Sequence, residues 1–283
     1  RSAIFLPIKN LGLIVMDEEH DVSYKQESPM PCYDARDVAI ERTRITPTKL
    51  IFGSATPSIR TWKRFFYEKK IKLSRMRERI SNIEIPEIKV VDMRKEFKKG
   101  NTKIFSNELL GLISQLKAKG EQAIVLIPRR GYNSFLSCRS CGFIINCPNC
   151  DVPLSVHLGS KGKQWLNCHW CDHKSKLINS CPDCRSRAFK PFGIGTQRVI
   201  EFINEEFPDL RVMRFDRDTT SGKDGHRNIL YEFSNGNADI LVGTQMLAKG
   251  IDIPNITLSV VIAADGLLHR PDISAEEKSL QLF

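Results

Sequence analysis

The chain has 283 residues, enough for one large or two ordinary domains. Its 41% hydrophobic and 27% charged residues are typical of a globular protein, and no apolar run approaches the roughly 20 residues of a membrane span. The N-terminal residues lack the pattern of a secretory signal, and the missing initiator Met indicates a piece of a longer protein. A formal net charge of +10 favours a polyanionic partner, either nucleic acid or an anionic membrane face.

The first stretch of the chain predicts a parallel α/β unit. The apolar run at 12–16 is typical of a strand buried on both faces, and it ends in Asp17-Glu18-Glu19-His20. A second buried strand at 49–52 runs into Gly53-Ser54-Ala55-Thr56-Pro57. Ligands bind at the carboxyl ends of strands in open α/β sheets, so both polar clusters contain candidate site residues.

A second α/β unit follows a boundary near residue 85. Ser106 is expected to cap a helix that ends at Gly120, and Thr196 is expected to open another. Strands are expected at 123–127, 211–215, 240–242 and 258–263. Strands that alternate with helices imply a second parallel sheet, interrupted by a cysteine-rich insertion. The expected domains are 1–85, 86–137, 138–190 (the insertion) and 191–283.

Eight of the nine cysteines form four Cys-x-x-Cys pairs. Disulfide frameworks belong to small secreted domains, whereas a Cys-x-x-Cys turn aims two thiolates at one tetrahedral metal ion. A redox dithiol seldom occurs four times in one chain, so the pairs predict ligands for two zinc ions. The pairs are Cys138/Cys141, Cys147/Cys150, Cys168/Cys171 and Cys181/Cys184.

The spacing of the pairs favours a nested arrangement, with the inner two pairs on one zinc and the outer two on the other. Only five residues separate the first pair from the second, so folding both of these pairs around one ion would require a tight loop. A crossed arrangement of the pairs stays open. His157, His169 and His173 are alternative ligands that eight thiolates make unnecessary, and Cys32 is expected to be unliganded. The insertion is basic; Trp165 and Trp170 offer stacking surfaces for bases, or the same surface docks a protein.

Three polar segments lie in the order of motifs II, III and V of superfamily 2 helicases: 17–20, 54–56 and Gly243 to Asp252. The chain resembles the PriA family of primosomal replication-restart helicases (primosomal protein N′) over nearly its whole length. Other segments that carry the resemblance are Tyr33 to Val38, Arg129 to Tyr132, Gly193 to Val199 and Asp216 to Thr220. The eight-cysteine insertion is that family's hallmark, and the family uses the nested zinc pairing.

The resemblance implies two RecA-like lobes, the first partial, with a two-zinc insertion in the second. It implies an ATP-dependent motor that moves 3′ to 5′ on DNA, recognises stalled or abandoned replication forks and restarts replication by loading the replicative helicase. The implied partners are fork and single-stranded DNA, a helicase loader and single-strand-binding protein, with no membrane. The implied location is the cytoplasm of a bacterium, in association with the nucleoid.

The resemblance also assigns roles by motif position, with Mg²⁺ and ATP as cofactors beside the two Zn²⁺. Asp17 is implied to hold Mg²⁺ through water, Glu18 to activate the attacking water, and His20 to couple the nucleotide to the DNA strand. The loop 21–33 corresponds to the family's DNA-sensing loop. The remaining motif residues are implied to link hydrolysis to lobe movement or to contact nucleotide and DNA: Ser54, Thr56, Thr244, Gly250 and Asp252.

The sequence departs from the family at the phosphate-binding loop. It contains no Gly-x-x-x-x-Gly-Lys-Ser/Thr, and it stops before the arginine-bearing motif VI, whose arginine is worth about 10³- to 10⁵-fold in the rates of related NTPases. We therefore expect that this chain alone is not an ATPase. A non-enzymatic zinc-ribbon adaptor is the alternative, but it has no reason to carry motifs II, III and V. The insertion disfavours an RNA or transcription-coupled translocase.

Overall fold

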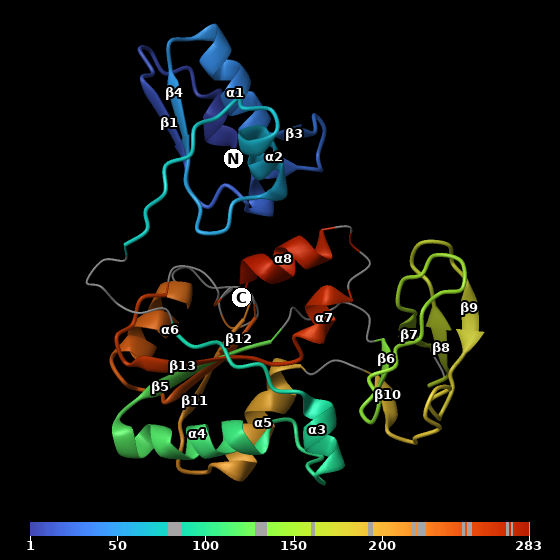
Figure 1. Cartoon of the computed structure of the whole chain (residues 1–283). Helices are drawn as coiled ribbons and strands as arrows, with labels where there is room; N and C mark the ends of the chain where they lie inside the picture. The colour runs from blue at the N-terminus through green and yellow to red at the C-terminus, as the bar shows by residue number, and fades with distance from the viewer. Residues whose placement is uncertain are drawn as a thin grey trace. The chain divides into compact units, whose positions relative to one another are not determined.

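A computed structural model describes residues 1–78, 86–127, 135–159, 162–191, 195–216, 219, 225–244, 247, 251–269, 272 and 274–282. The chain divides into two compact units, Arg1–Pro86 and Glu87–Phe283, and we describe each by itself (Figure 1). None of the described helices is long and apolar enough to cross a membrane.

The first unit is built on two parallel strands, β1 (Leu13–Met16) and β4 (Lys49–Phe52), in which Met16 pairs with Phe52. Helix α1 (Ala35–Ile45) packs on this pair through Ala35 and Ala39, which share a small core with Met16. The remaining elements of the unit are η1 (Ser2–Phe5), η2 (Val22–Tyr24), β2 (Lys25–Gln26), β3 (Tyr33–Asp34), α1 (Ala35–Ile45) and α2 (Ile59–Phe66).

Strand β4 has the predicted bounds, and β1 begins one residue after its predicted start. The prediction that these strands are buried on both faces is wrong for the unit as described. Val15 is 59% exposed and Ile51 is 52% exposed. The reason is that α1 covers one face of a sheet of two strands, where Ile14, Met16, Leu50 and Phe52 lie together in the core.

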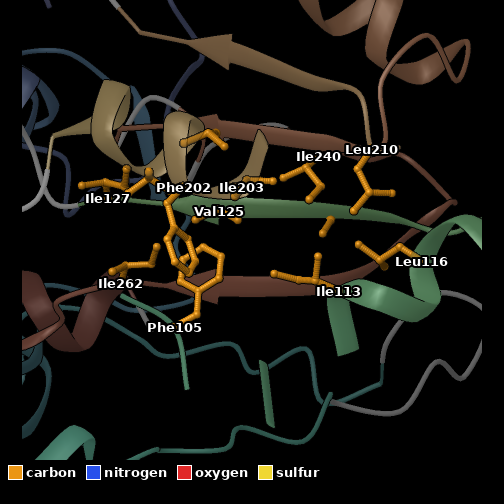
Figure 2. Close-up of a cluster of buried hydrophobic side chains, with 13 residues drawn as sticks. Phe105, Ile113, Leu116, Val125, Ile127, Phe202, Ile203, Leu210, Ile240 and Ile262 are labelled. Carbon is orange, nitrogen blue, oxygen red and sulfur yellow. The ribbon is translucent and has the colours of Figure 1, made fainter. Parts of the chain in front are cut away.

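The second unit contains a four-stranded parallel sheet in the order β11-β12-β5-β13. Its two central strands are buried on both faces, because alternate side chains enter two different cores. Val125 and Ile240 pack with Phe105 and with helices α4 (Asn107–Lys119) and α5 (Thr196–Glu206) (Figure 2). On the other face, Leu126 and Leu241 pack with Phe233 of α6 (Gly225–Ser234). The strands are β5 (Gln122–Leu126), β11 (Val212–Phe215), β12 (Ile240–Gly243) and β13 (Ile256–Val261).

The helices of this unit are α3 (Met93–Lys98), α4 (Asn107–Lys119), α5 (Thr196–Glu206), α6 (Gly225–Ser234), α7 (Asp265–Leu268) and α8 (Ala275–Leu282). The predicted limits of α4 are confirmed. Ser106 is its N-cap and accepts a hydrogen bond from Leu109 N at 3.2 Å, and Gly120 ends it with φ of 66°. Thr196 is the first residue of α5, also as predicted.

The cysteine-rich segment lies between β5 and α5 in the chain. Strands β6 (Leu136–Cys138) and β10 (Phe189–Pro191) pair antiparallel, so the insertion leaves and rejoins the lobe at one place. Its outer part is an antiparallel sheet of β7 (Ser155–Leu158), β8 (Gln164–Asn167) and β9 (Lys174–Lys176). Four cysteines and four apolar side chains form its small core.

Gly243→Ala should destabilise the second unit by about 2 kcal/mol, the usual cost of overpacking a dense interior. A Cβ at this position would lie 2.3 Å from the Phe215 carbonyl oxygen and 2.6 Å from Leu247 Cδ1. Urea unfolding measures the change in free energy. Gly111→Ala is the control, because Gly111 lies inside α4 with nothing within 4 Å of its Cβ position, and alanine should stabilise that helix. Equal free energies for the two variants would contradict this account.

Candidate nucleotide site and metal centres

The polar segments at 17–20 and 53–58 lie side by side, because they follow the carboxyl ends of the paired parallel strands β1 and β4. Backbone hydrogen bonds continue the pairing beyond the strands. Gly53 N donates to Met16 O at 2.9 Å, and Glu19 N donates to Gly53 O at 3.0 Å. The two loops are therefore held in fixed register.

His20 and Ser54 join the two loops through their side chains. Nδ1 of His20 lies 2.7 Å from Oγ of Ser54, which also accepts a hydrogen bond from Thr56 N at 3.0 Å. The same His20 nitrogen lies 3.3 Å from a carboxylate oxygen of Glu18. His20 thus contacts both Ser54 of the second loop and Glu18 of the first.

Asp17 and Glu18 present their carboxylates to solvent, where they are free to meet a ligand. Both residues are exposed, and Asp17 Oδ1 accepts a hydrogen bond from Glu18 N at 3.0 Å. Glu18 has φ of 47°, in the left-handed region that a side chain rarely adopts. The Tyr24 hydroxyl donates to Asp17 O at 2.7 Å, which fixes the backbone from the other side.

Glu19 has a role that the sequence analysis missed. It is 1% exposed, and its carboxylate accepts hydrogen bonds from Ser58 N at 2.6 Å, Ser58 Oγ at 3.1 Å and Thr61 Oγ1 at 2.9 Å. It thereby fixes Ser58, the N-cap of helix α2, which follows the Ser54 loop. Three adjacent carboxylates look alike in a sequence, and only burial separates this structural one from its neighbours.

Arg36 fixes the first loop from helix α1. Its guanidinium forms a two-point contact with Asp34 (Nε to Oδ1 2.8 Å, Nη2 to Oδ2 2.8 Å) and also donates to Glu19 O at 2.8 Å. Burial by itself raises the pKa of Asp34, but the hydrogen bonds and charge of Arg36, with the charge of Arg60, outweigh it and hold this pKa below its ordinary value. The ion pair therefore persists at neutral pH.

The predicted residues of the second unit lie at the carboxyl edge of its sheet or beyond it. Thr244 is buried directly after β12, and its carbonyl accepts a hydrogen bond from Leu247 N at 2.9 Å. Asp216 follows the neighbouring strand β11, where Arg214 Nε donates to it at 2.6 Å. Asp252 is exposed, and Gly250 lies outside the described residues.

The eight paired cysteines form two clusters of four, and the grouping is nested. In each cluster all four sulfur atoms lie within 4.8 Å of one another. We call Cys138, Cys141, Cys181 and Cys184 the proximal cluster, because it adjoins the β6/β10 pair, and Cys147, Cys150, Cys168 and Cys171 the distal cluster.

All four Cys-x-x-Cys turns have the same backbone geometry. The residue after the second cysteine donates its N–H to the carbonyl of the first cysteine, at distances from 2.8 to 3.1 Å. Each of these residues has a positive φ: Gly142 (87°), Asp151 (52°), Asp172 (57°) and Arg185 (58°). Repeated left-handed turns hold each pair of thiols pointing at its cluster.

The donor set and its spacing fit zinc. Sulfur atoms lie 3.5 Å apart for Cys138 and Cys184 and 3.6 Å apart for Cys147 and Cys171, close to the separation of about 3.8 Å that tetrahedral bonds of about 2.3 Å give. Hydrogen bonding to Cys171, burial and Cys168 raise the pKa of Cys150 to about 12, whereas the backbone N–H of His173 lowers the pKa of Cys171 to about 7. Four such thiols ionise together only around a cation.

Comparisons with known proteins agree with this arrangement. Residues 147–176 match the PriA DNA helicase Cys-rich region (CRR) domain, and residues 176–275 match the helicase conserved C-terminal domain. The replication restart protein PriA of Synechocystis sp. is 48% identical over 285 residues, which cover 99% of this chain and 34% of that protein. PriA of Bacillus subtilis is 45% identical, with 100% and 34% covered.

The chain belongs to the PriA family. It spans about a third of the length of the curated relatives it matches. The two parallel α/β units of this PriA-family chain are RecA-like lobes, the first partial, and the cysteine-rich insertion lies in the second. Among solved structures, Saccharomyces cerevisiae Dbp5 bound to RNA and ADP BeF3 aligns with 99% of this chain and 52% of that chain, at 13% identity and a TM-score of 0.42.

The other candidate ligands of the sequence analysis lie outside both clusters. Nε2 of His157 is 3.3 Å from Nε2 of His169, and the His157 ring stacks on Trp165 with centroids 5.7 Å apart. The carbonyl of His173 accepts a hydrogen bond from Cys168 N, so its part in the distal cluster is played by its backbone. Cys32 is an exposed free thiol of the first unit.

Titration of the purified chain with a mercurial thiol reagent should release two zinc ions per chain, because each four-thiol cluster is a complete tetrahedral donor set. A zinc-sensitive dye measures the release. Cys32→Ser is the control and should leave the value at two, since Cys32 belongs to neither cluster. One ion or none from the parental chain would refute the two-site assignment.

Proposed function

We propose that this chain is the middle part of an ATP-dependent DNA helicase that moves 3′ to 5′. The helicase would recognise stalled or abandoned replication forks and restart replication by loading the replicative helicase. The contact that supports the motor most directly is the 2.7 Å approach of His20 to Ser54, because it joins a candidate hydrolysis loop to a candidate coupling loop. Whole-length similarity to replication restart proteins supports the biological setting.

In this proposal the exposed carboxylates of the first loop act on the nucleotide. Mg²⁺ would supply charge neutralisation at the phosphates. Asp17 would hold it through water, and Glu18 would orient the attacking water and take up its proton. His20, hydrogen-bonded to Ser54 and close to Glu18, would transmit the state of the nucleotide to the second loop.

The remaining motif residues take supporting roles in the proposal. Ser54 and Thr56 would link hydrolysis to lobe movement, and Thr244, Gly250 and Asp252 would contact nucleotide or DNA. The first lobe would comprise residues 1–85 and the second 86–137 and 191–283, with the metal module at 138–190. The proposed partners are a helicase loader and single-strand-binding protein, and the proposed place of action is the bacterial cytoplasm, at the nucleoid.

The metal module would contribute to DNA contact through its surface chemistry. All eight paired cysteines would ligate zinc, which holds the module's small core together. Trp170 is 58% exposed, and Lys174 and Lys176 are exposed on the adjoining strand β9. Aromatic faces beside lysines bind single-stranded DNA by stacking and charge.

Glu18→Gln, in the longer protein that contains this segment, should lower DNA-stimulated ATP hydrolysis by about 100-fold or more, the usual contribution of a general base. Phosphate release measures the rate, and ATP binding should persist. Glu41→Gln is the control, because Glu41 is an exposed glutamate of α1 paired with Arg44. The 283-residue chain alone should show no hydrolysis above background, since it contains no phosphate-binding loop motif. An unchanged rate in Glu18→Gln would refute the role of Glu18 as general base, whereas no DNA-stimulated hydrolysis by the unmutated longer protein would favour the non-enzymatic adaptor.

Ser54→Ala should separate hydrolysis from strand displacement in the same protein. The variant loses the hydroxyl that contacts His20 and Thr56 N but leaves Asp17 and Glu18 in place. We expect strand displacement per ATP hydrolysed to fall about tenfold or more, as expected for an interaction that links two steps. The His20→Ala/Ser54→Ala double variant should be no worse than the worse single variant, because the two residues act as one contact. Independent, multiplicative losses would contradict the coupling role.

A further inference from the structure

Two arginines join the metal module to the second lobe, and both act at the first Cys-x-x-Cys turn of the proximal cluster. Arg139 lies inside that turn, between Cys138 and Cys141. Arg94 reaches the same turn from helix α3 of the lobe. Neither residue belongs to the candidate nucleotide site or to the metal ligands.

Arg139 connects the turn to the loop that precedes α4. Its Nη1 donates to Thr102 O at 3.0 Å and its Nη2 to Lys103 O at 3.3 Å. Its backbone N–H donates to Ala188 O at 3.0 Å, next to β10. Arg139 thus connects the first turn of the insertion both to its last residues and to the lobe.

The loop that accepts these bonds is itself fixed to the core of the lobe. Asn101 is 9% exposed, and its amide donates to Phe105 O at 2.9 Å and to Glu96 Oε2 at 3.0 Å. The side-chain oxygen Oδ1 of Asn101 accepts a hydrogen bond from Lys103 N at 2.9 Å. Phe105 is part of the buried cluster against the central sheet (Figure 2). The bonds of Arg139 are therefore made to a well-anchored backbone.

Arg94 covers the other side of the turn. Asp92 holds its guanidinium at two points, Nε to Oδ1 at 2.9 Å and Nη2 to Oδ2 at 2.8 Å, which leaves Nη1 to face Cys141 O at 3.5 Å. The side chain lies directly on Gly142, where a Cβ would be 3.1 Å from Arg94 Cδ. Of the four left-handed positions that follow the cysteine pairs, this one is glycine, and Arg94 occupies the space a side chain would need.

We propose that Arg94 and Arg139 form a clasp that makes the proximal cluster part of the second lobe, so that module and lobe turn as one body. The two clusters then have different tasks. The proximal cluster shapes the turn that the clasp grips, whereas the distal cluster stabilises the outer end of the module. Whatever the module contacts is carried by each movement of the lobe.

The Arg94→Ala/Arg139→Ala double variant of this chain tests the clasp. Rotational correlation times from ¹⁵N relaxation should be equal for lobe and module in the parental chain, and shorter for the module in the variant. Arg187→Ala/Lys190→Ala is the control, since it removes the same charge from exposed positions of the module. Zinc content should stay at two ions in all three proteins. Equal correlation times in the clasp variant, or unequal ones in the parental chain, would overturn the proposal.

Cysteine variants test the difference between the clusters by hydrogen exchange. Cys181→Ser should accelerate exchange about tenfold or more both in the module and at residues 101–105, because the gripped turn is lost with its metal. Cys168→Ser should confine the acceleration to residues 144–176. Identical exchange maps would overturn the division of tasks. Neither experiment involves ATP or DNA, so the clasp is tested separately from the proposed motor.

Discussion

Parallel pairing of neighbouring strands is the constraint on which the candidate nucleotide-site residues of both units depend. Residues at the carboxyl ends of parallel strands lie at the same edge of the sheet. Segments that are far apart in the sequence therefore become neighbours there. In the first unit this brings His20 to Ser54, and in the second Asp216 and Thr244 directly follow the paired residues Phe215 and Gly243. Gly243 shows how tight this edge is, since the Phe215 carbonyl occupies the space of any Cβ.

The first loop shows how one run of acidic residues is divided between chemistry and structure. Glu19 is buried against the N-terminus of α2, and Arg36 donates a hydrogen bond to the Glu19 carbonyl oxygen. The backbone is thus fixed on both sides, while the side chains of Asp17 and Glu18 stay exposed. Preorganisation of this kind lowers the cost of holding charged groups in position for a ligand.

Local patterns determined most of what the sequence predicted correctly. The limits of α4 follow from Ser106 and Gly120, and the nested cysteine grouping follows from the short spacing between the first two pairs. The failures concern burial and backbone conformation, which depend on residues far away in the chain. Burial alone separates Glu19 from Glu18, and exposure of Val15 reflects how few strands surround β1. Asp151 and Asp172 are of a residue type enriched in left-handed turns, but the side chain of Arg185 gives no sign that it adopts one. The roles of the motif residues stay predictions.

The antiparallel pairing of β6 with β10 has a consequence for how the chain folds. Strand β5 and helix α5 pack in one core, yet the whole insertion separates them in sequence. Closing a loop of that length costs conformational entropy before any contact offsets it. If the proximal thiols take up their metal first, the two ends of the insertion are already together, and the lobe closes as if the intervening residues were a short connection. The metal would then determine the order in which the lobe assembles as well as the shape of the module.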